Sequence, residues 1–263
     1  FTWRMPTIYY IWNLLPNGKS ILALYWLTSA VFLGSIFMTV KKLTNSKLAA
    51  VSTALILPYL AANLVYPTSF LFMEWWSLFA LTLGICAYVY KKWLPAAFFL
   101  LLAALVREIA IFPIIFMFSA SIITKSQRLF FTVIIFLFLS AYSLHTYSVG
   151  KIAPPNNQET SPVSRIHLPD KQSTLTMTSF SMQFYPLVKY RIPQIFILIS
   201  VGGFMYLFFK NKPLFKKSLF FYLAFLPQLL IFPLITTSLY NDYWGILFMP
   251  LLVASLPLAL ENI

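Results

Sequence analysis

The chain has 263 residues, of which 60% are apolar and only 10% are charged. A soluble domain carries charge on roughly a quarter of its residues, and too few polar side chains are present here to cover a water-exposed surface. The single cysteine, Cys86, has no intrachain disulfide partner. These features exclude a soluble enzyme, a disordered chain and a secreted domain held by disulfides.

Apolar blocks of about 20 residues, the length that crosses a bilayer core, recur along the chain. They predict seven membrane-spanning helices, at residues 20–40, 47–66, 74–90, 128–149, 193–209, 217–239 and 243–260. Residues 5–16 are too short to span, and their tyrosines and tryptophan predict a helix at the membrane interface. We therefore predict an all-α, polytopic membrane helix bundle that forms one transmembrane domain over residues 1–263.

The stretch 93–124 needs a different interpretation, because as one helix it would measure about 48 Å at 1.5 Å per residue. Arg107 and Glu108 divide it into two short pieces, and Pro113 breaks or kinks a continuous helix. We predict a hairpin of two short helices over 93–124, with Arg107 and Glu108 at its tip.

The basic residues predict which connectors share a side of the membrane. With 93–124 as a hairpin, short connectors that hold 11 of the 19 basic residues and no acidic residue all fall on one side. The positive-inside rule makes that side cytoplasmic. The 11 basic residues are Lys41, Lys42, Lys47, Lys91, Lys92, Lys125, Arg128, Lys210, Lys212, Lys216 and Lys217. A composition rich in Phe, Ile and Lys and poor in Gly is typical of an AT-rich prokaryotic genome, so we expect the plasma (inner) membrane of a prokaryote.

The formal charge of +13 is thereby explained without a nucleic-acid partner. The opposite, extracytoplasmic side receives residues 1–19, the tip of the hairpin and the proline-rich polar segment 150–192. We expect residues 1–19 to be the end of an extracytoplasmic loop and 150–192 to be a long extracytoplasmic loop.

Ionisable groups inside a membrane cost about 2.5–3.5 kcal/mol or more each, and therefore mark functional sites. Arg107 and Glu108 are the clearest such pair. In one interpretation Arg107 binds a phosphate while Glu108 binds a hydroxyl or a second basic group. In the other, the two side chains belong to a structural ion network that fixes the hairpin.

Glu74 opens a predicted span directly after an extracytoplasmic connector. The helix dipole alone favours a carboxylate there. The functional alternative places Glu74 at the mouth of a cavity, with Trp75 and Trp76 as sugar-stacking surfaces. Tryptophans at such a position are also typical interface anchors.

Three charged residues near other span ends are further candidates. Lys189 and Arg191 precede a span on the outer side, where they contact headgroups or capture an anionic lipid carrier, since a guanidinium binds phosphate in a bidentate manner. Asp242 is most simply the N-cap of the last span. The two histidines lie too far apart for metal-ligand spacing, so no metal site is predicted and any need for a divalent metal stays open.

The residues around these candidates resemble the core of membrane glycosyltransferases of the GT-C superfamily. The resemblance covers residues 70–118: an acidic residue opens a span, a basic connector follows, and a short helix ends in Ala-Leu-x-Arg-Glu before a proline-containing helix. The matching stretches are Glu74-Trp-Trp-Ser-Leu-Phe-Ala-Leu, then Lys91-Lys92, then Leu101-Leu-Ala-Ala-Leu-Val-Arg107-Glu108-Ile-Ala-Ile-Phe-Pro113.

This resemblance implies transfer of a sugar from a polyprenyl-phosphate carrier, the lipid-phosphate sugar donor, to a glycan, lipid or protein acceptor on the extracytoplasmic face. It implies two groups of site residues. Those for the donor phosphate are Arg4, Arg107, Lys189 and Arg191, and those that position sugar or acceptor are Glu74, Glu108, Trp75, Trp76 and Asp242.

In the superfamily the catalytic acid lies in the first extracytoplasmic loop, after an outward span. Residues 1–19 contain no Asp or Glu, so we expect that span and the catalytic base to lie upstream of Phe1, and these 263 residues alone to be inactive.

Two alternative functions remain. One is a transporter or flippase, which predicts repeats and interrupted helices that the sequence does not reveal. The other is a polymerase or ligase of lipid-linked glycans.

The predicted sidedness is tested by cysteine labelling. Cysteines introduced separately at Thr160 and Pro213 are expected to react with impermeant reagents from opposite sides of the membrane. The unsubstituted chain, whose Cys86 lies in an apolar run, gives the background. Labelling of both positions from outside would contradict this topology.

Overall fold

The computed structural model of the chain describes residues 6–65, 71–123, 127–152, 192–235 and 245–259. Within these ranges the regular structure is helical and contains no strand, which confirms the all-α prediction. The elements are α1 (Thr7–Asn13), α2 (Gly18–Leu43), α3 (Ser46–Val65), α4 (Met73–Val89), α5 (Trp93–Val106), the 3₁₀ turn η2 (Glu108–Ala110), α6 (Ile111–Ile123), α7 (Arg128–Ile152), α9 (Ile192–Lys210), α10 (Lys212–Leu223), α11 (Leu226–Ile235) and α12 (Met249–Ala259).

Two helices are long and apolar enough to cross a membrane: Gly18–Leu43 in α2, with 26 residues, and Arg128–Lys151 in α7, with 24. The other apolar helices of the described ranges are shorter by the same measure. The structure therefore supports a helical protein with two membrane-length helices, while the count of seven full spans stays a prediction.

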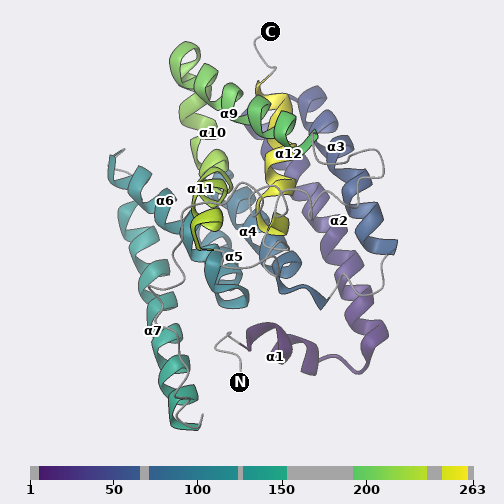
Figure 1. Cartoon of the computed structure of the whole chain (residues 1–263), viewed down its shortest axis with the longest axis vertical. Coiled ribbons are helices and arrows are strands. Elements are labelled where there is room, and N and C mark those ends of the chain that lie inside the picture. Colours follow the sequence, from purple (N-terminus) through teal and green to yellow (C-terminus); the bar gives the residue numbers. More distant parts are fainter. Residues whose placement is uncertain (1–5, 66–70, 124–126, 153–191, 236–244, 260–263) are drawn as a thin grey trace.

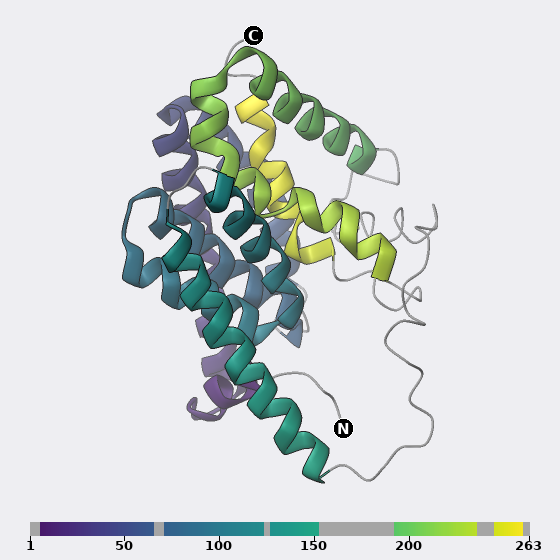
Figure 2. The ribbon, with the colours of Figure 1, turned by 90° about the vertical axis from the view of Figure 1, so that its left-hand side faces the viewer.

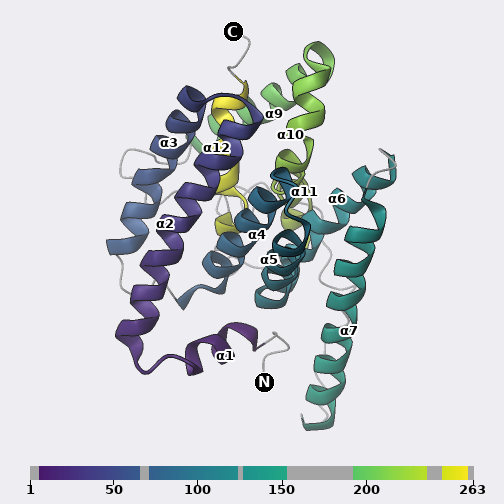
Figure 3. The same ribbon diagram turned by 180° about the vertical axis from the view of Figure 1, so that it is seen from behind.

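Helix α4 lies at the centre of the bundle (Figures 1 and 3). Most of its side chains are buried, and it packs along α5 on one side and α2 on the other. Helix α3 packs on α2, and α12 packs on α3 and α9. Helix α7 covers α5 and α6 at the opposite edge and extends beyond the other helices at its C-terminal end (Figure 2).

The long helices satisfy their polar groups internally. Asn17 caps α2, because its side chain accepts a hydrogen bond from the backbone N–H of Ser20 at 3.0 Å. Hydroxyl groups within α2 donate to carbonyls one turn earlier, as Ser29 does to Tyr25 at 2.8 Å. Such bonding needs no water, so these residues are compatible with an apolar environment.

The predicted break in 93–124 is confirmed at Arg107, which separates α5 from η2 and α6. Arg107 ends α5 because its backbone is extended, with φ −142° and ψ 109°. Pro113 lies in the first turn of α6, where a backbone N–H has no intrahelical partner to lose. The start of α5 contacts the start of α7 (Arg128–Ile152), since the rings of Trp93 and Phe130 are 5.7 Å apart.

The hairpin brings lysine-bearing connectors to one end of the bundle. Lys42 in the last turn of α2, Lys91 in the α4–α5 turn and Lys217 in α10 line a single pocket. We call this the lysine end. Helix α1 lies at the other end of α2 (Figure 1). Three of the eleven connector residues thus lie together, and the grouping of the others and the assignment of the lysine end to the cytoplasm stay predictions.

The prediction of one helix over 217–239 is wrong, because α10 ends at Leu223 and α11 begins three residues later. Pro227 explains the break: it lacks an N–H, and its ring clashes with the carbonyl four residues earlier, that of Leu223. The side-chain amide of Gln228 donates to the carbonyl oxygen of Ala224 at 2.5 Å. A buried glutamine thus satisfies a carbonyl that the break leaves free.

Within the described residues, the α-helix of the last predicted span, 243–260, also begins later than expected. Residues 245–247 form a 3₁₀ turn, and α12 starts at Met249. The backbone N–H of Leu252 donates to the carbonyl of Phe248 at 2.9 Å, which marks the first α-helical bond.

Close packing of α4 on α5 depends on Gly84. A Cβ atom there would lie 2.8 Å from Cγ and Cδ2 of Leu100 and 3.0 Å from its backbone nitrogen. We expect Gly84→Ala to lower the free energy of unfolding by about 1–3 kcal/mol, because the helices must separate. Thermal unfolding in detergent micelles measures the loss.

Gly34→Ala is the matched control, since no heavy atom lies within 4 Å of the corresponding Cβ in α2. Alanine there is expected to be neutral or stabilising by up to about 1 kcal/mol. Equal melting temperatures for the two variants would contradict the close approach of α4 and α5.

Candidate functional site

Three charged side chains meet where α4 begins and α5 ends. The Nε atom of Arg107 lies 2.6 Å from Oε1 of Glu74, and its Nη1 lies 3.3 Å from Oε1 of Glu108. The Arg107 and Glu74 side chains are 2% and 3% exposed, whereas that of Glu108 is 29% exposed. We call Glu74, Arg107 and Glu108 the triad.

The register of α4 against α5 brings the triad together. The hydroxyl of Ser77 in α4 donates to the carbonyl oxygen of Ala103 in α5 at 2.9 Å. Glu74 lies three residues before Ser77 and Arg107 four residues after Ala103, which is about one helical turn in each helix. Since the helices run in opposite directions, the same step brings the carboxylate and the guanidinium face to face.

Helix α1 packs against the helix ends that carry the triad. The hydroxyl of Thr7 donates to the carbonyl oxygen of Leu105 at 2.8 Å, near the end of α5. Ile8 is buried, and the ring of Trp12 meets that of Trp76 edge-on at 6.2 Å. The short helix predicted over residues 5–16 therefore lies at the triad end of the bundle.

The electrostatics of the triad follow from its burial. Glu74 lies in the first turn of α4, where the helix dipole favours a carboxylate. A lone buried carboxylate costs several kcal/mol, and a paired guanidinium offsets that cost. Two carboxylates share Arg107, so the triad carries a formal charge of −1. Glu108 is the partly exposed member, and it is therefore the one that a molecule outside the protein can contact.

The geometry favours the structural interpretation of Arg107 over direct phosphate binding. Its guanidinium is almost fully enclosed and contacts two carboxylates. A phosphate that approached it would be repelled by both carboxylates. Arg107 therefore anchors the tip of the hairpin, and the predicted donor-phosphate role does not match its surroundings.

The tryptophans beside Glu74 belong to the core. Trp75 is fully buried against Phe79, with ring centroids 5.8 Å apart, and Trp76 packs against Tyr25 at 5.8 Å as well as against Trp12. Neither ring presents an open face, so the stacking surface expected for Trp75 and Trp76 does not occur in this arrangement. They are packing residues that fix the start of α4.

The remaining predicted site residues, Arg4, Lys189, Arg191 and Asp242, lie outside the described residues, as does most of the predicted loop 150–192. Within the described ranges no group of three or more His, Cys, Asp or Glu residues is placed to hold a metal ion. The positioning residues Ser77 and Thr7 were missed by sequence reasoning, although Ser77 stands one turn after Glu74 on the same helix face.

The fold and the triad together define a helical protein with membrane-length helices and a buried ion network at one end. Comparisons of the chain with models of protein families, with curated proteins and with solved structures give no match. The resemblance to GT-C glycosyltransferases therefore rests on the residues of the sequence alone.

A double-mutant cycle tests the Glu74–Arg107 pair. Glu74→Leu and Arg107→Met are each expected to lower the free energy of unfolding by about 3–5 kcal/mol, because each leaves a buried charge with less compensation. The double variant is expected to lose less than the sum, since both buried charges are then gone. Unfolding in detergent measures all four proteins.

Lys19→Met is the control, because Lys19 is exposed in the first turn of α2 and surface changes stay within about 0.5 kcal/mol. Strict additivity of the two triad substitutions would show that Glu74 and Arg107 do not interact.

Proposed function

We propose that this protein is a multi-span membrane glycosyltransferase of the GT-C type, which moves a sugar from a polyprenyl-phosphate carrier to an acceptor on the extracytoplasmic face. The observation that carries the proposal is the triad: a buried Glu74–Arg107 pair that holds a partly exposed Glu108 at the tip of a short hairpin. Ionisable side chains inside a membrane protein are energetically costly, and contact with a polar substrate explains why they are present.

In this proposal Glu108 is the substrate-contacting member. Its carboxylate accepts hydrogen bonds from sugar or acceptor hydroxyl groups. Arg107 is a positioning residue, because it holds one oxygen of Glu108 through Nη1 while Glu74 fixes its Nε. A carboxylate fixed in this way loses little conformational freedom when it binds, which is what substrate orientation demands.

The reaction itself needs two further groups. A carboxylate base takes the proton from the acceptor hydroxyl, whose oxygen forms the new bond to the anomeric carbon as the bond to the carrier phosphate breaks. Positive charge stabilises the departing lipid phosphate. We assign the phosphate contact to Arg4, Lys189 or Arg191 and place Asp242 near the acceptor.

The placement in the membrane follows from the two ends of the bundle. The lysine end faces the cytoplasm of a prokaryotic cell and the triad end faces outward, as the positive-inside rule requires. We place α2 and α7, the two helices of membrane length, across the bilayer, with the shorter helices completing a polytopic bundle whose partners are membrane lipids and the lipid-linked sugar.

One observation favours a second candidate function, a transporter of lipid-linked sugars. The break between α10 and α11 carries a fully buried Gln228, and its Oε1 has no hydrogen-bond partner among the described residues. Interrupted helices with free polar groups are where membrane transporters bind substrate. A polymerase or ligase of lipid-linked glycans shares the outward-facing site but finds no separate support.

Turnover of the natural full-length protein in proteoliposomes tests the proposal. Release of polyprenyl phosphate from a labelled lipid-linked sugar is expected to fall about 100-fold in Glu108→Gln, which corresponds to a lost charged hydrogen bond of about 3 kcal/mol. Its melting temperature is expected to stay close to that of the parent, because Glu108 is partly exposed.

Glu108→Asp is the matched variant, and part of the activity is expected to return because the charge is kept. Normal release by Glu108→Gln would remove Glu108 from the site. Movement of intact lipid-linked sugar across the bilayer without transfer, lost in Gln228→Leu, would establish the transporter instead.

A further inference from the structure

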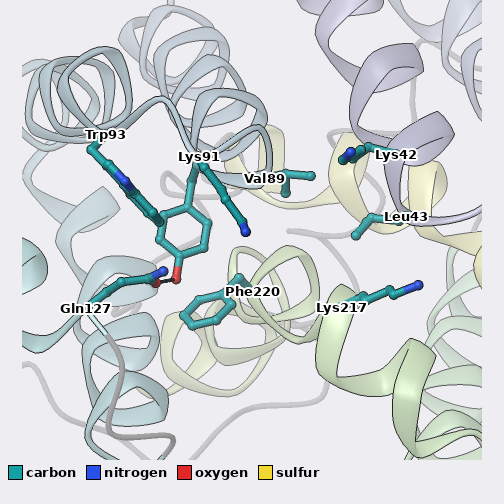
Figure 4. A pocket seen from close by; sticks show the side chains of 9 residues that line it. Lys42, Leu43, Val89, Lys91, Trp93, Gln127, Lys217 and Phe220 are labelled. Carbon is teal, nitrogen blue, oxygen red and sulfur yellow. Dashed lines mark hydrogen bonds between the residues drawn. The ribbon is translucent and has the colours of Figure 1, made fainter.

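A pocket of about 410 Å³ lies at the lysine end, far from the triad. Three lysines line it, from the end of α2, the α4–α5 turn and α10: Lys42, Lys91 and Lys217. Lys91 extends toward the centre of the pocket, while Lys42 and Lys217 come from the opposite side (Figure 4). Three elements that are distant in sequence therefore each place a lysine at one pocket, and the ammonium group of Lys217 points away from Lys91 in this structure (Figure 4).

No acidic residue lines this pocket, and the two acidic residues within the described ranges, Glu74 and Glu108, both belong to the triad. The side chains of Lys42, Lys91 and Lys217 are exposed to solvent, which screens their mutual repulsion. Three positive charges with no carboxylate among the lining residues make the pocket favourable for an anion from outside the described part of the chain. A phosphate group fits best, because lysines bind its several oxygens as mobile point charges.

The wall of the pocket is aromatic and fixed. Tyr88 is buried, and its ring lies 4.8 Å from that of Phe220 and 5.5 Å from that of Trp93. Its hydroxyl is hydrogen-bonded to the side chain of Gln127 (Figure 4). The pocket thus offers apolar surface next to positive charge, the pattern that a lipid headgroup with its acyl chains requires.

Two residues that line the pocket have an unusual backbone conformation. Lys91 and Gln127 have φ angles of +58° and +57°, and they are the non-glycine residues with positive φ within the described part of the chain. Lys91 follows the end of α4, where glycine is the favoured residue. A lysine in this conformation is less stable than glycine, so its side chain rather than its backbone explains its presence there.

We propose that this pocket binds the phosphate group of an anionic phospholipid headgroup from the leaflet at the lysine end. In the complex the exposed side chain of Lys217 turns toward Lys42 and Lys91, so that the three ammonium groups surround the phosphate, and the acyl chains lie along the aromatic wall. The site is separate from the triad and does not depend on the proposed function.

Native mass spectrometry of the purified full-length protein in detergent tests the site, with dioleoylphosphatidylglycerol and dioleoylphosphatidylcholine as probes. We expect the first phosphatidylglycerol to bind more tightly than phosphatidylcholine. The triple variant K42Q/K91Q/K217Q is expected to weaken phosphatidylglycerol binding roughly 100-fold, because each lysine near a membrane surface contributes about fivefold.

The triple variant K41Q/K92Q/K216Q is the matched control, since each lysine is the sequence neighbour of a pocket lysine, is exposed and does not line the pocket. The control is expected to keep the affinity within about twofold. Equal losses in both triple variants would mean general charge attraction and would overturn the site, as would no loss in either.

Two further measurements test which molecule supplies the phosphate group and whether the side chain of Lys91 contributes to binding. Pyrophosphate that binds at the pocket lysines while phosphatidylglycerol does not would overturn the lipid assignment. Lys91→Gly is expected to raise the melting temperature by about 2–4 °C and yet weaken phosphatidylglycerol binding about fivefold. Unchanged lipid affinity in Lys91→Gly would contradict the proposal.

Discussion

The ion pair between Arg107 and Glu74 determines how the central helices meet. A buried guanidinium requires carboxylate partners, and the partners here come from the start of α4 and from the residue that follows Arg107. The chain satisfies this requirement by ending α5 at Arg107 and turning back into α6. The bond between Ser77 and Ala103 and the close approach at Gly84 hold α4 and α5 in the register that the pair needs.

The same constraint divides the molecule into two ends of opposite character. The acidic side chains of the described ranges lie in the triad, next to α1, whereas the pocket lysines lie at the C-terminal end of α2, in the turn after α4 and within α10. A protein with this polarity is suited to a membrane, where the two ends face different solutions. The proposed sugar-transfer site and the proposed lipid site use opposite ends, so each can be altered without the other.

Local signals made much of the fold predictable. The apolar runs predicted the helices, and Arg107 with Pro113 predicted the hairpin, because charge and proline act on the nearest turn. The pairing of Glu74 with Arg107, 33 residues apart in sequence, depends on the register of two helices and has no local signal. Pro227 did signal the α10–α11 break, but the continuous apolar run around it outweighed that signal. The burial of Trp75 and Trp76 depends on α1 and the neighbouring rings, which no sequence pattern fixes.

A structure of the full-length protein with a polyprenyl-phosphate sugar bound tests the central claim most directly. The account predicts that an oxygen of Glu108 lies within about 3 Å of a sugar or acceptor hydroxyl, while Arg107 keeps its contacts to Glu74 and Glu108. A donor bound away from the hairpin tip, or a guanidinium of Arg107 that has left both carboxylates for the phosphate, would contradict it.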